Sequence, residues 1–470
     1  MKKLIALLLA LVMVISMAAC GASEPAPTDP PKTNDPAPVD TPKDNTASAE
    51  PIEIVWWTYF GDTNIGYLQT IVDAFNESQT TYHLTIEFQG GQAEVNAKLA
   101  STVQSELPAL FNCAVENVAM CDAATYCTNI QPYVDADPAG WPELESTWAS
   151  LRAAYSDVDG KLVGYPCGYS YPGLYYNADM LKEAGIDPAT LLTYTDIYEA
   201  SKKLVEGGYC TYGVGFHPDG YYPTASIGRE GLIAYNNRNG YDGKITECLY
   251  VSDDTVNAAL TEMLTAYQKL HAENLCVPYG SDYQADIIPQ IAAGECAMMI
   301  GVVSMTTKIL SAVDGKFEVG IVPLASCTDA GKRTGEPAGG TGIFIGNNGK
   351  AEEMQGAYEF IKFLSKGEWS AHFAVSTGYL APNQQAYDSD TYQDFITNTW
   401  PNAADIYVSL NASDDSASNP YIPISNEMKA ANKLMVETVS ADPNADIASV
   451  IETAYESIQE AIELYNLSNP

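Results

Sequence analysis

The sequence is poor in positive charge: it holds 23 lysines and arginines against 60 aspartates and glutamates, a formal net charge of −37 at pH 7. Binding to nucleic acid, or direct adsorption to anionic lipid, depends on basic patches that neutralise phosphate groups. A chain this acidic is unsuited to either role, so we expect no nucleic-acid partner. The excess of acid is typical of a solvated, soluble surface.

The sequence also lacks the motifs of common catalytic and metal sites. Its four histidines (residues 83, 217, 271 and 372) have neither metal-ligand nor catalytic-triad spacing, and no G-x-S-x-G elbow is present. The ten cysteines form no C-x₂-C pair and no Cys/His cluster of zinc spacing, which favours a role as small buried apolar residues. We therefore expect no metal, no cofactor and no enzymatic activity. A glycan-active enzyme is the open alternative, because a pair of carboxylates can be chosen from sixty acids at almost any spacing.

Only one long hydrophobic run occurs, and it lies at the N-terminus. Residues 4–18 are mostly apolar, which is short for a bilayer core of ~30 Å. Two lysines precede the run and small residues follow it, so residues 1–19 are predicted to be a secretory signal peptide. The next residue, Cys20, resembles the cysteine of a bacterial lipobox, although Met17 stands where leucine is commoner. That resemblance implies a lipidated Cys20; an ordinary signal peptide with a chance cysteine is the alternative.

The segment that follows is rich in proline. Residues 21–50 contain seven prolines and no aromatic residue. Such a segment cannot bury enough apolar surface to offset its chain entropy. We therefore expect residues 20–50 to form a lipidated, disordered tether. This tether would hold the rest of the chain at the extracellular face of the cytoplasmic membrane.

The remaining residues have the length and composition of two packed domains. Strand patterns at 52–57, 82–88 and 109–115 alternate with helical patterns, which predicts a doubly wound parallel sheet. Further strands and helices are expected at 174–177, 178–185, 195–206, 296–301, 317–323, 341–346, 351–366, 367–376 and 422–466. Ligands of such sheets bind beyond the carboxyl ends of the strands. The loops at these ends are expected at 57–62, 115–120, 168–173 and 338–342.

Five segments carry a family resemblance: "WWTYFGD", "YPCGYSYPGLYYNADMLKEAGIDP", "ECAMMIGVVS", "PAGGTGIFIG" and "STGYLAPN". In this order the chain resembles the extracellular solute-binding proteins (family 1) of ABC importers. It is most similar to the branch that binds glycerol-3-phosphate, maltose or oligosaccharides. The resemblance implies a two-lobed, periplasmic-binding-protein-like α/β fold, each lobe a doubly wound, mostly parallel sheet flanked by helices. It places residues 51–168 and 329–375 in the first lobe and 169–328 and 376–470 in the second.

The resemblance also implies a mechanism and partners. A small molecule would bind in the cleft between the lobes, which would close over it by a hinge motion. The expected partners are this ligand, the transmembrane subunits of an ABC permease, and the membrane through the lipid anchor. The binding protein itself is expected to be a monomer.

Four ligand-binding residues are carried over from the glycerol-3-phosphate binders. These are Glu116, Ser170, Gly340 and Tyr379. An unpaired carboxylate at a buried strand end is costly, so Glu116 is expected to bind a ligand hydroxyl rather than to form a salt bridge.

Other positions depart from the glycerol-3-phosphate binders. Gln92 replaces a tyrosine, and Val302 and Val303 replace two serines. No arginine follows Tyr379, so the arginine that binds phosphate in those proteins has no counterpart. Because the planar guanidinium is the natural partner of a phosphate, the sequence favours a neutral carbohydrate, and an oligosaccharide in particular. A glycerol-3-phosphate or glycerophosphodiester binder of the same fold is the alternative.

Tyrosines supply the remaining candidates, because sugar sites combine aromatic platforms with polar groups. Tyr59 follows the first strand, and Tyr169 and Tyr171 lie in a segment broken by glycine and proline. Tyr221 and Tyr222 fall where family members place stacking aromatics. We therefore expect a lipid-anchored receptor that delivers a carbohydrate to an ABC permease. A sensor for a membrane kinase would use the same cleft and stays open.

Overall fold

The computed structural model describes residues 50–216, 219–278, 283–329, 339–401 and 419–469. The expected signal peptide, Cys20, the tether up to residue 49, and His217 lie outside the described residues. Among the helices that are described, none is both long and apolar enough to cross a membrane.

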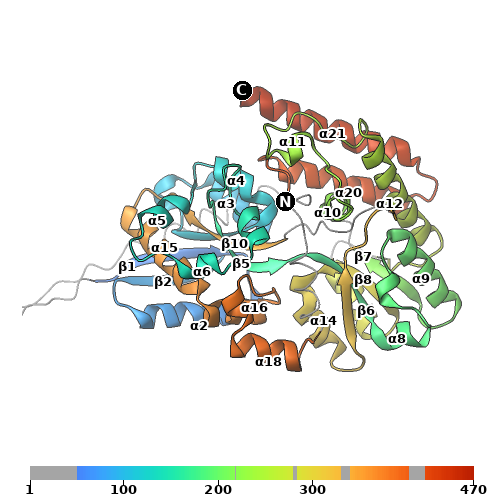
Figure 1. Cartoon of the computed structure of the whole chain (residues 1–470), viewed down its shortest axis with the longest axis horizontal. Coiled ribbons are helices and arrows are strands. Elements are labelled where there is room, and N and C mark those ends of the chain that lie inside the picture. Colours follow the sequence, from blue (N-terminus) through green and yellow to red (C-terminus); the bar gives the residue numbers. More distant parts are fainter. Residues whose placement is uncertain (1–49, 217–218, 279–282, 330–338, 402–418, 470) are drawn as a thin grey trace, which may run out of the picture. The chain divides into compact units, whose positions relative to one another are not determined.

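The first sheet has six strands in the order β2-β1-β3-β10-β4, with β5 also paired to β10 (Figure 1). Its strands are β1 (Ile52–Thr58), β2 (Tyr82–Phe88), β3 (Leu110–Ala114), β4 (Cys127–Thr128), β5 (Tyr165–Ser170) and β10 (Gly339–Gly346). β1 runs parallel to both β2 and β3, whereas β10 runs antiparallel to β3, β4 and β5.

The second sheet has four strands in the order β7-β8-β6-β9. They are β6 (Pro172–Asn177), β7 (Tyr212–Phe216), β8 (Cys296–Val302) and β9 (Val319–Pro323). β7 and β8 are parallel, while β6 is antiparallel to both β8 and β9. Both sheets are therefore mixed, and the expectation that each would be mostly parallel is wrong, because β5, β6 and β10 pair antiparallel to their neighbours. The antiparallel strands β6 and β10 are those through which the chain enters one sheet after leaving the other.

The expected loop at residues 168–173 is instead formed by two strand ends. β5 runs to Ser170 and β6 begins at Pro172, so Tyr171 alone links the two sheets here. Glycine and proline do not break β5 because Pro166 pairs with β10 on one side only and lies beside a register shift in that pairing; the other edge of β5 is bridged at Tyr169, by Leu380. Proline is tolerated on strands that leave one edge unpaired.

Helices cover both sheets (Figure 1). Around the first sheet they are α2 (Asp62–Ser78), α3 (Gln92–Ser101), α4 (Val118–Ala123), α5 (Gln131–Ala136), α6 (Pro142–Glu145), α7 (Ala149–Ala154), α15 (Ala351–Ser365), α16 (Gly367–Thr377), α17 (Gln384–Tyr387) and α18 (Asp390–Asn398). Around the second they are α8 (Ala178–Glu183), α9 (Tyr194–Glu206), α10 (Tyr221–Arg229), α11 (Asn236–Asn239), α12 (Asp254–Ala272), α13 (Tyr283–Ala292), α14 (Thr306–Val313), α20 (Ser425–Ala441) and α21 (Ile447–Ser468).

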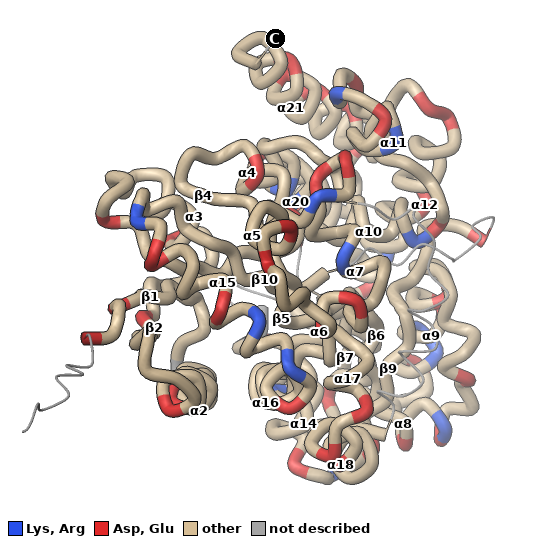
Figure 2. The backbone as a smooth tube through the Cα atoms, turned by 60° about the vertical axis from the view of Figure 1, so that its left-hand side comes forward, with Lys and Arg blue, Asp and Glu red and all other residues tan. Residues whose placement is uncertain are grey.

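Acidic positions are spread over these elements rather than gathered in one place. Figure 2 shows aspartate and glutamate on α2, α8, α18 and α21, with lysine and arginine scattered between them. Mutual repulsion of like charges is smaller when they are dispersed and solvated. The distribution agrees with a solvated surface.

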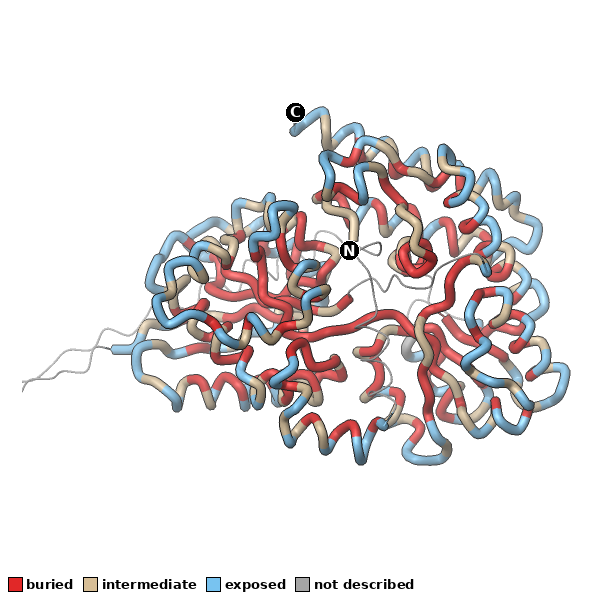
Figure 3. The backbone as a smooth tube through the Cα atoms, viewed as in Figure 1, coloured by how far each residue is buried: buried red, intermediate tan, exposed pale blue. Residues whose placement is uncertain are grey.

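Large buried residues of β6 and β8 alternate between the two faces of the second sheet. Leu174 of β6 packs with α9, α12 and α20, whereas the next residue, Tyr175, packs in the cluster that also contains the first-sheet core. Met298 and Met299 of β8 divide in the same way. This follows from the two-residue period of a strand. Figure 3 shows the buried strands at the centre of each sheet with exposed helix faces outside.

The same packing bears on the lobe boundaries. α18, which carries Tyr392 and Phe395, packs on α16 and α17 beside the first sheet, and Trp400 packs on Phe395, whereas Met428 and Ile458 belong to the cluster of α12, α20 and α21. We therefore propose that the second segment of the first lobe extends to Trp400, rather than ending at residue 375.

The nine cysteines after Cys20 are free thiols, and eight of them are buried. Only Cys210 is partly exposed. This confirms the expectation that these cysteines act as small apolar core residues.

One buried amide joins three strands of the first sheet. Asn112 on β3 is fully buried. Its Oδ1 accepts a hydrogen bond from Trp56 Nε1 of β1 at 2.8 Å, and its Nδ2 donates to the Gly342 carbonyl of β10 at 3.1 Å. A buried polar group of this kind stabilises the fold only while every partner is satisfied.

We expect Asn112→Ala to lower the free energy of unfolding by roughly 3 kcal/mol, because it leaves two buried polar groups without partners. Asn398→Ala is the matched control, since among the described residues the Asn398 side chain makes an exposed hydrogen bond to Asp394. Chemical denaturation of both variants measures the difference. Equal stabilities would contradict the role assigned to Asn112.

Candidate functional site

A cavity of about 150 Å³ lies between strand ends of the two sheets and the ends of the helices that pack on them. Elements of the first sheet contribute Gln92, Glu116, Ser170, Gly339, Gly340 and Tyr379. Elements of the second contribute Asp219, Tyr221, Val302, Ser304 and Lys429. Tyr171 and Pro172, at the crossing between the sheets, complete the wall.

Seven of the ten predicted ligand-binding residues lie on this cavity. They are Gln92, Glu116, Ser170, Tyr171, Tyr221, Gly340 and Tyr379. Their contact with a ligand stays a prediction. The cavity lies where strand ends that are far apart in sequence meet, as the sheet topology requires.

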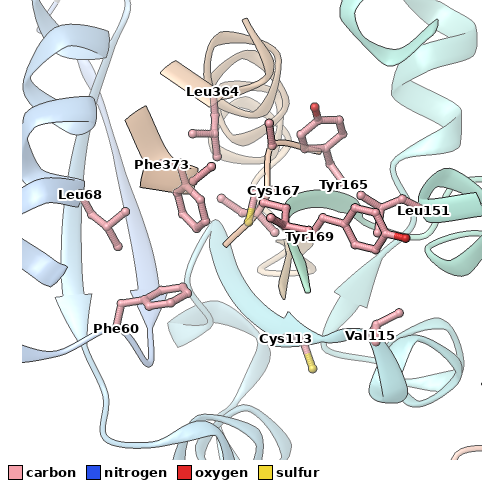
Figure 4. Packing of buried hydrophobic residues seen from close by; sticks show 14 of the residues in the cluster. Phe60, Leu68, Cys113, Val115, Leu151, Tyr165, Cys167, Tyr169, Leu364 and Phe373 are labelled. Carbon is pink, nitrogen blue, oxygen red and sulfur yellow. The ribbon is translucent and has the colours of Figure 1, made fainter. Parts of the chain in front are cut away.

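The other three predicted residues do not line the cavity. Tyr169 is 2% exposed and alternates with Ser170 along β5, so its ring lies in the core, among the buried residues of Figure 4. Tyr222 is 3% exposed and packs in the cluster of α10 and α12. Tyr59 lies against the first-sheet core, where its hydroxyl donates to Thr341 Oγ1.

β5 and β10, at the crossing between the two sheets, lie unusually close together. Gly339 pairs with Ser170, and Gly340 pairs with Tyr169. Gly340 has φ +119°, and a Cβ placed there would lie 2.1 Å from the Gly168 carbonyl oxygen. Only glycine satisfies both conditions, so the backbone of β10 can approach the cavity wall at this position.

Serine hydroxyls add polar groups beside the crossing. Ser170 Oγ accepts a hydrogen bond from the Ser304 amide at 3.4 Å, which links β5 to the turn after β8. Val302 lines the cavity as an apolar residue, but Ser304 supplies a hydroxyl two positions later. The two valines at 302 and 303 gave no sign in the sequence that a serine just beyond them reaches the wall.

Tyr379 is held as an aromatic wall. Its ring centroid lies 6.0 Å from that of Phe60, edge to face, and 6.4 Å from that of Phe373. Burial, and after it the neighbouring Cys167, raises the pKa of the Tyr379 phenol well above its usual range. The side chain is therefore neutral at physiological pH and can offer both a ring face and a hydroxyl donor.

An ion-pair triad occupies one side of the cavity. Lys429 Nζ of α20 lies 3.0 Å from Glu116 Oε1 and 3.8 Å from Asp219 Oδ1. The expectation that Glu116 would form no salt bridge is therefore wrong: the sequence could not show that α20 brings a lysine to this strand end. One cation faces two carboxylates, so the triad has a net charge of −1.

Lys429 is also the wall residue that sequence reasoning missed. Only two basic residues, Lys429 and Lys433, follow Tyr379 in the chain. The small number of basic residues late in the chain could have pointed to these two lysines. Only the placement of α20 shows which of them faces the cavity. No group of three or more His, Cys, Asp or Glu side chains among the described residues could hold a metal ion.

Residues 70–399 match the family described as bacterial extracellular solute-binding protein. The chain belongs to this family. Among curated relatives, the sn-glycerol-3-phosphate-binding periplasmic protein UgpB of Agrobacterium fabrum is 26% identical over 344 residues, covering 72% of this chain and 75% of the relative. UgpB of Pectobacterium atrosepticum is 24% identical over 407 residues, covering 85% of this chain and 87% of the relative.

Solved structures show the fold of this solute-binding protein. The GacH receptor of Streptomyces glaucescens has a TM-score of 0.70 at 16% identity, covering 88% of this chain and 99% of that one. The Listeria monocytogenes substrate-binding protein Lmo0181, in complex with cycloalternan, has a TM-score of 0.71 at 16% identity, with coverages of 88% and 99%. The Thermus thermophilus maltotriose binding protein has a TM-score of 0.66 at 19% identity, with coverages of 87% and 100%. The predicted two-lobed α/β binding-protein fold is confirmed.

We expect Gly340→Ala to destabilise this protein more than a glycine replacement without a close neighbour. Gly140→Ala is the matched control: Gly140 also has positive φ, +69°, but nothing lies within 4 Å of the place that a Cβ would occupy. The control should lose about 1 kcal/mol and Gly340→Ala roughly 3 kcal/mol, the difference arising from the clash with Gly168. Thermal unfolding measures both, and equal losses would show that the close approach is not required.

Proposed function

We propose that the protein is a lipid-anchored receptor that binds a neutral carbohydrate in this cavity and delivers it to an ABC permease. The lobes close over the ligand by a hinge motion, and the transporter's ATPase supplies the energy for uptake. The proposal combines the family, the chemistry of the cavity wall and the lipobox-like N-terminus.

The charge balance of the cavity is the observation that carries the choice of ligand. Lys429 is the one cationic side chain on the wall, within the described residues, and Glu116 and Asp219 already neutralise it. A phosphate ester would have to compete with Glu116 for the lysine while facing the charge of Asp219. In a cavity of reduced dielectric, such like-charge contacts oppose binding strongly.

The rest of the wall suits a hydroxyl-rich molecule. Tyr221 and Tyr379 offer ring faces for C–H groups, while Gln92 and Ser304 offer amide and hydroxyl partners. Neutral-ligand sites combine apolar walls with a few convergent polar groups in this way. The solved neighbours with the same fold include proteins in complex with cycloalternan, maltotriose and ribitol.

The size of the cavity bears on ligand length. About 150 Å³ is below the 300–1,000 Å³ of sites for drug-sized ligands. In this conformation the cavity suits a small ligand or one end of a longer one. We propose an oligosaccharide bound through one terminal ring, with the remaining rings outside the cavity.

Glycerol-3-phosphate is the second candidate. Several curated relatives are named for binding it, at 24–26% identity. The absence of an arginine after Tyr379 and the neutralised state of Lys429 weigh against this ligand.

A panel of ribitol, maltose, maltotriose and glycerol-3-phosphate tests the proposal. We expect at least one of the sugars or the polyol to raise the unfolding temperature, and glycerol-3-phosphate to have no effect. Ligand at a hundredfold excess over Kd stabilises by about 2.7 kcal/mol, which a thermal-shift assay detects. Stabilisation by glycerol-3-phosphate alone would contradict the proposal.

The same panel tests the aromatic wall. Tyr379→Ala should weaken binding at least tenfold in apparent Kd, because it removes a ring from the cavity. Tyr67→Ala is the matched control, since Tyr67 lies on α2 and is 49% exposed. Equal affinities for both variants would remove Tyr379 from the site.

We expect Cys20→Ala to abolish lipidation and to release the protein from membranes into the soluble fraction. Metabolic labelling with an alkyne fatty acid, followed by detergent partitioning, measures this. Cys210→Ala controls for loss of a partly exposed cysteine elsewhere. Absence of labelling in the wild type would favour an ordinary signal peptide, and persistent labelling of the Cys20 variant would place the lipid on another residue.

A further inference from the structure

Three polar contacts join one short segment of the second lobe to one turn of the first. The segment is 421–429, and its partners lie within 116–122, shortly after β3. The three contacts are Tyr421 Oη to Asp122 Oδ2 at 2.7 Å, Ser425 Oγ to Asn117 Oδ1 at 2.6 Å, and Lys429 Nζ to Glu116 Oε1 at 3.0 Å. Each contact joins residues that are 299 to 313 positions apart in the chain.

The two sides of these contacts pack on different sheets. Ile422, Ile424 and Met428 belong to the cluster of α12, α20 and α21, beside the second sheet. On the other side, α4 packs against β4, and the short helix η2 (Val115–Asn117) packs against β10, both strands of the first sheet. A hinge motion that opens the lobes therefore separates all three pairs.

Tyr421 is held in position by the second lobe alone. Its amide donates to the Asn239 carbonyl at 2.8 Å, and its ring centroid lies 5.6 Å from that of Tyr241. Residues 237–239 all have left-handed backbone, with φ of 52°, 50° and 54°, and a Cβ on Gly240 would lie 2.9 Å from the Tyr421 carbonyl oxygen. Such backbone persists only where the surrounding structure requires it. This turn therefore fixes Tyr421 whether or not the first lobe is near.

Asp122 is held in a similar way by the first lobe. Its Oδ1 accepts a hydrogen bond from Asn129 Nδ2 at 2.7 Å, which leaves Oδ2 to accept from Tyr421. A hydrogen bond to a carboxylate is roughly twice as strong as one between neutral groups. Neither Tyr421 nor Asp122 lines the cavity, so their bond forms without any contact to a ligand.

Lys429 keeps a partner when the lobes separate. Asp219, which belongs to the second lobe, lies 3.8 Å from the ammonium, whereas Glu116 belongs to the first. Opening breaks the pair with Glu116 and leaves the pair with Asp219 in place. The segment can therefore release the first lobe without leaving the ammonium unpaired.

We propose that residues 421–429 form a latch that holds the two lobes closed, with Tyr421 as a positioning residue that acts through Asp122 and does not touch the ligand. The inference rests on the hinge motion of the proposed function, but not on the identity of the ligand. A ligand that requires the closed form binds with an apparent Kd equal to the intrinsic Kd divided by the closed fraction. The latch therefore raises affinity from outside the cavity.

Single-molecule FRET between the lobes measures the closed fraction in the unliganded protein. Dyes are attached to Val103→Cys in the first lobe and Leu464→Cys in the second, because both side chains are exposed. A Cys210→Ala background removes the one partly exposed native thiol.

Tyr421→Phe should lower the ratio of closed to open molecules about tenfold, as expected for one lost hydrogen bond to a charged group. Tyr198→Phe is the matched control and should leave the ratio unchanged. The Tyr198 hydroxyl also donates to a carboxylate, Glu273 at 2.6 Å, but both residues lie within the second lobe.

A double variant shows whether Tyr421 acts through its partner. In the Tyr421→Phe background, Asp122→Asn should have no further effect on the closed-to-open ratio, because the bond between the two residues is already lost. A further decrease of similar size would assign the effect of Tyr421 to ring packing and overturn its role in the latch.

Binding measurements extend the test. For whichever of ribitol, maltose and maltotriose binds a mostly open wild type, Tyr421→Phe should raise the apparent Kd about tenfold, and Tyr198→Phe should not change it. If none of the three binds, the proposed function fails, and the FRET distributions of the unliganded variants decide the latch. Equal distributions for the wild type and both tyrosine variants, with equal Kd values where a ligand binds, overturn it.

Discussion

The pairing of β5 with β10 is the constraint on which the site depends. It sets Gly340 against Tyr169 at a distance that only glycine permits, at the point where the chain leaves the first sheet for the second. Leu380 pairs with the same tyrosine through backbone hydrogen bonds of 2.8 and 3.1 Å, which carries Tyr379 to the cavity. Three segments distant in sequence thus meet through main-chain hydrogen bonds. Side chains of the cavity wall are then positioned by rigid strand ends, an arrangement that favours precise recognition.

Polar contacts also fix α20, and the segment before it, against the residues that follow β3. Beside the Glu116–Lys429 pair, Ser425 Oγ donates to Asn117 Oδ1 at 2.6 Å and the Tyr421 hydroxyl donates to Asp122 at 2.7 Å. Burial, with Asp122 next, raises the pKa of Tyr421 well above its usual range, so this hydroxyl remains a donor. The charge of the cavity consequently depends on a C-terminal helix. That is why a chain with no late arginine still presents one cation, and why this cation is already neutralised.

Much of the fold could be predicted from residue patterns. The expected strands at 82–88 and 296–301 and the helix at 351–366 lie within one residue of β2, β8 and α15. The alternation of Leu174 and Tyr175 between opposite faces of β6 also agrees with the expected period. Local patterns failed at β5 and β7: β5 was interrupted by glycine and proline, and the short β7 contains two glycines that hide its period. Pairing with β10 and β8 overrides these weak local signals.

Residue order alone was enough to infer the family, the alternation of strands and helices, and seven residues of the cavity wall, because these follow from local pattern and motif order. Packing in three dimensions was needed to show that Tyr169 turns into the core and that Glu116 meets Lys429. The Glu116–Lys429 contact depends on a partner more than 50 residues away, and the direction of the Tyr169 side chain depends on the register in which β5 pairs. Such contacts arise from packing of whole elements, and no single segment encodes them.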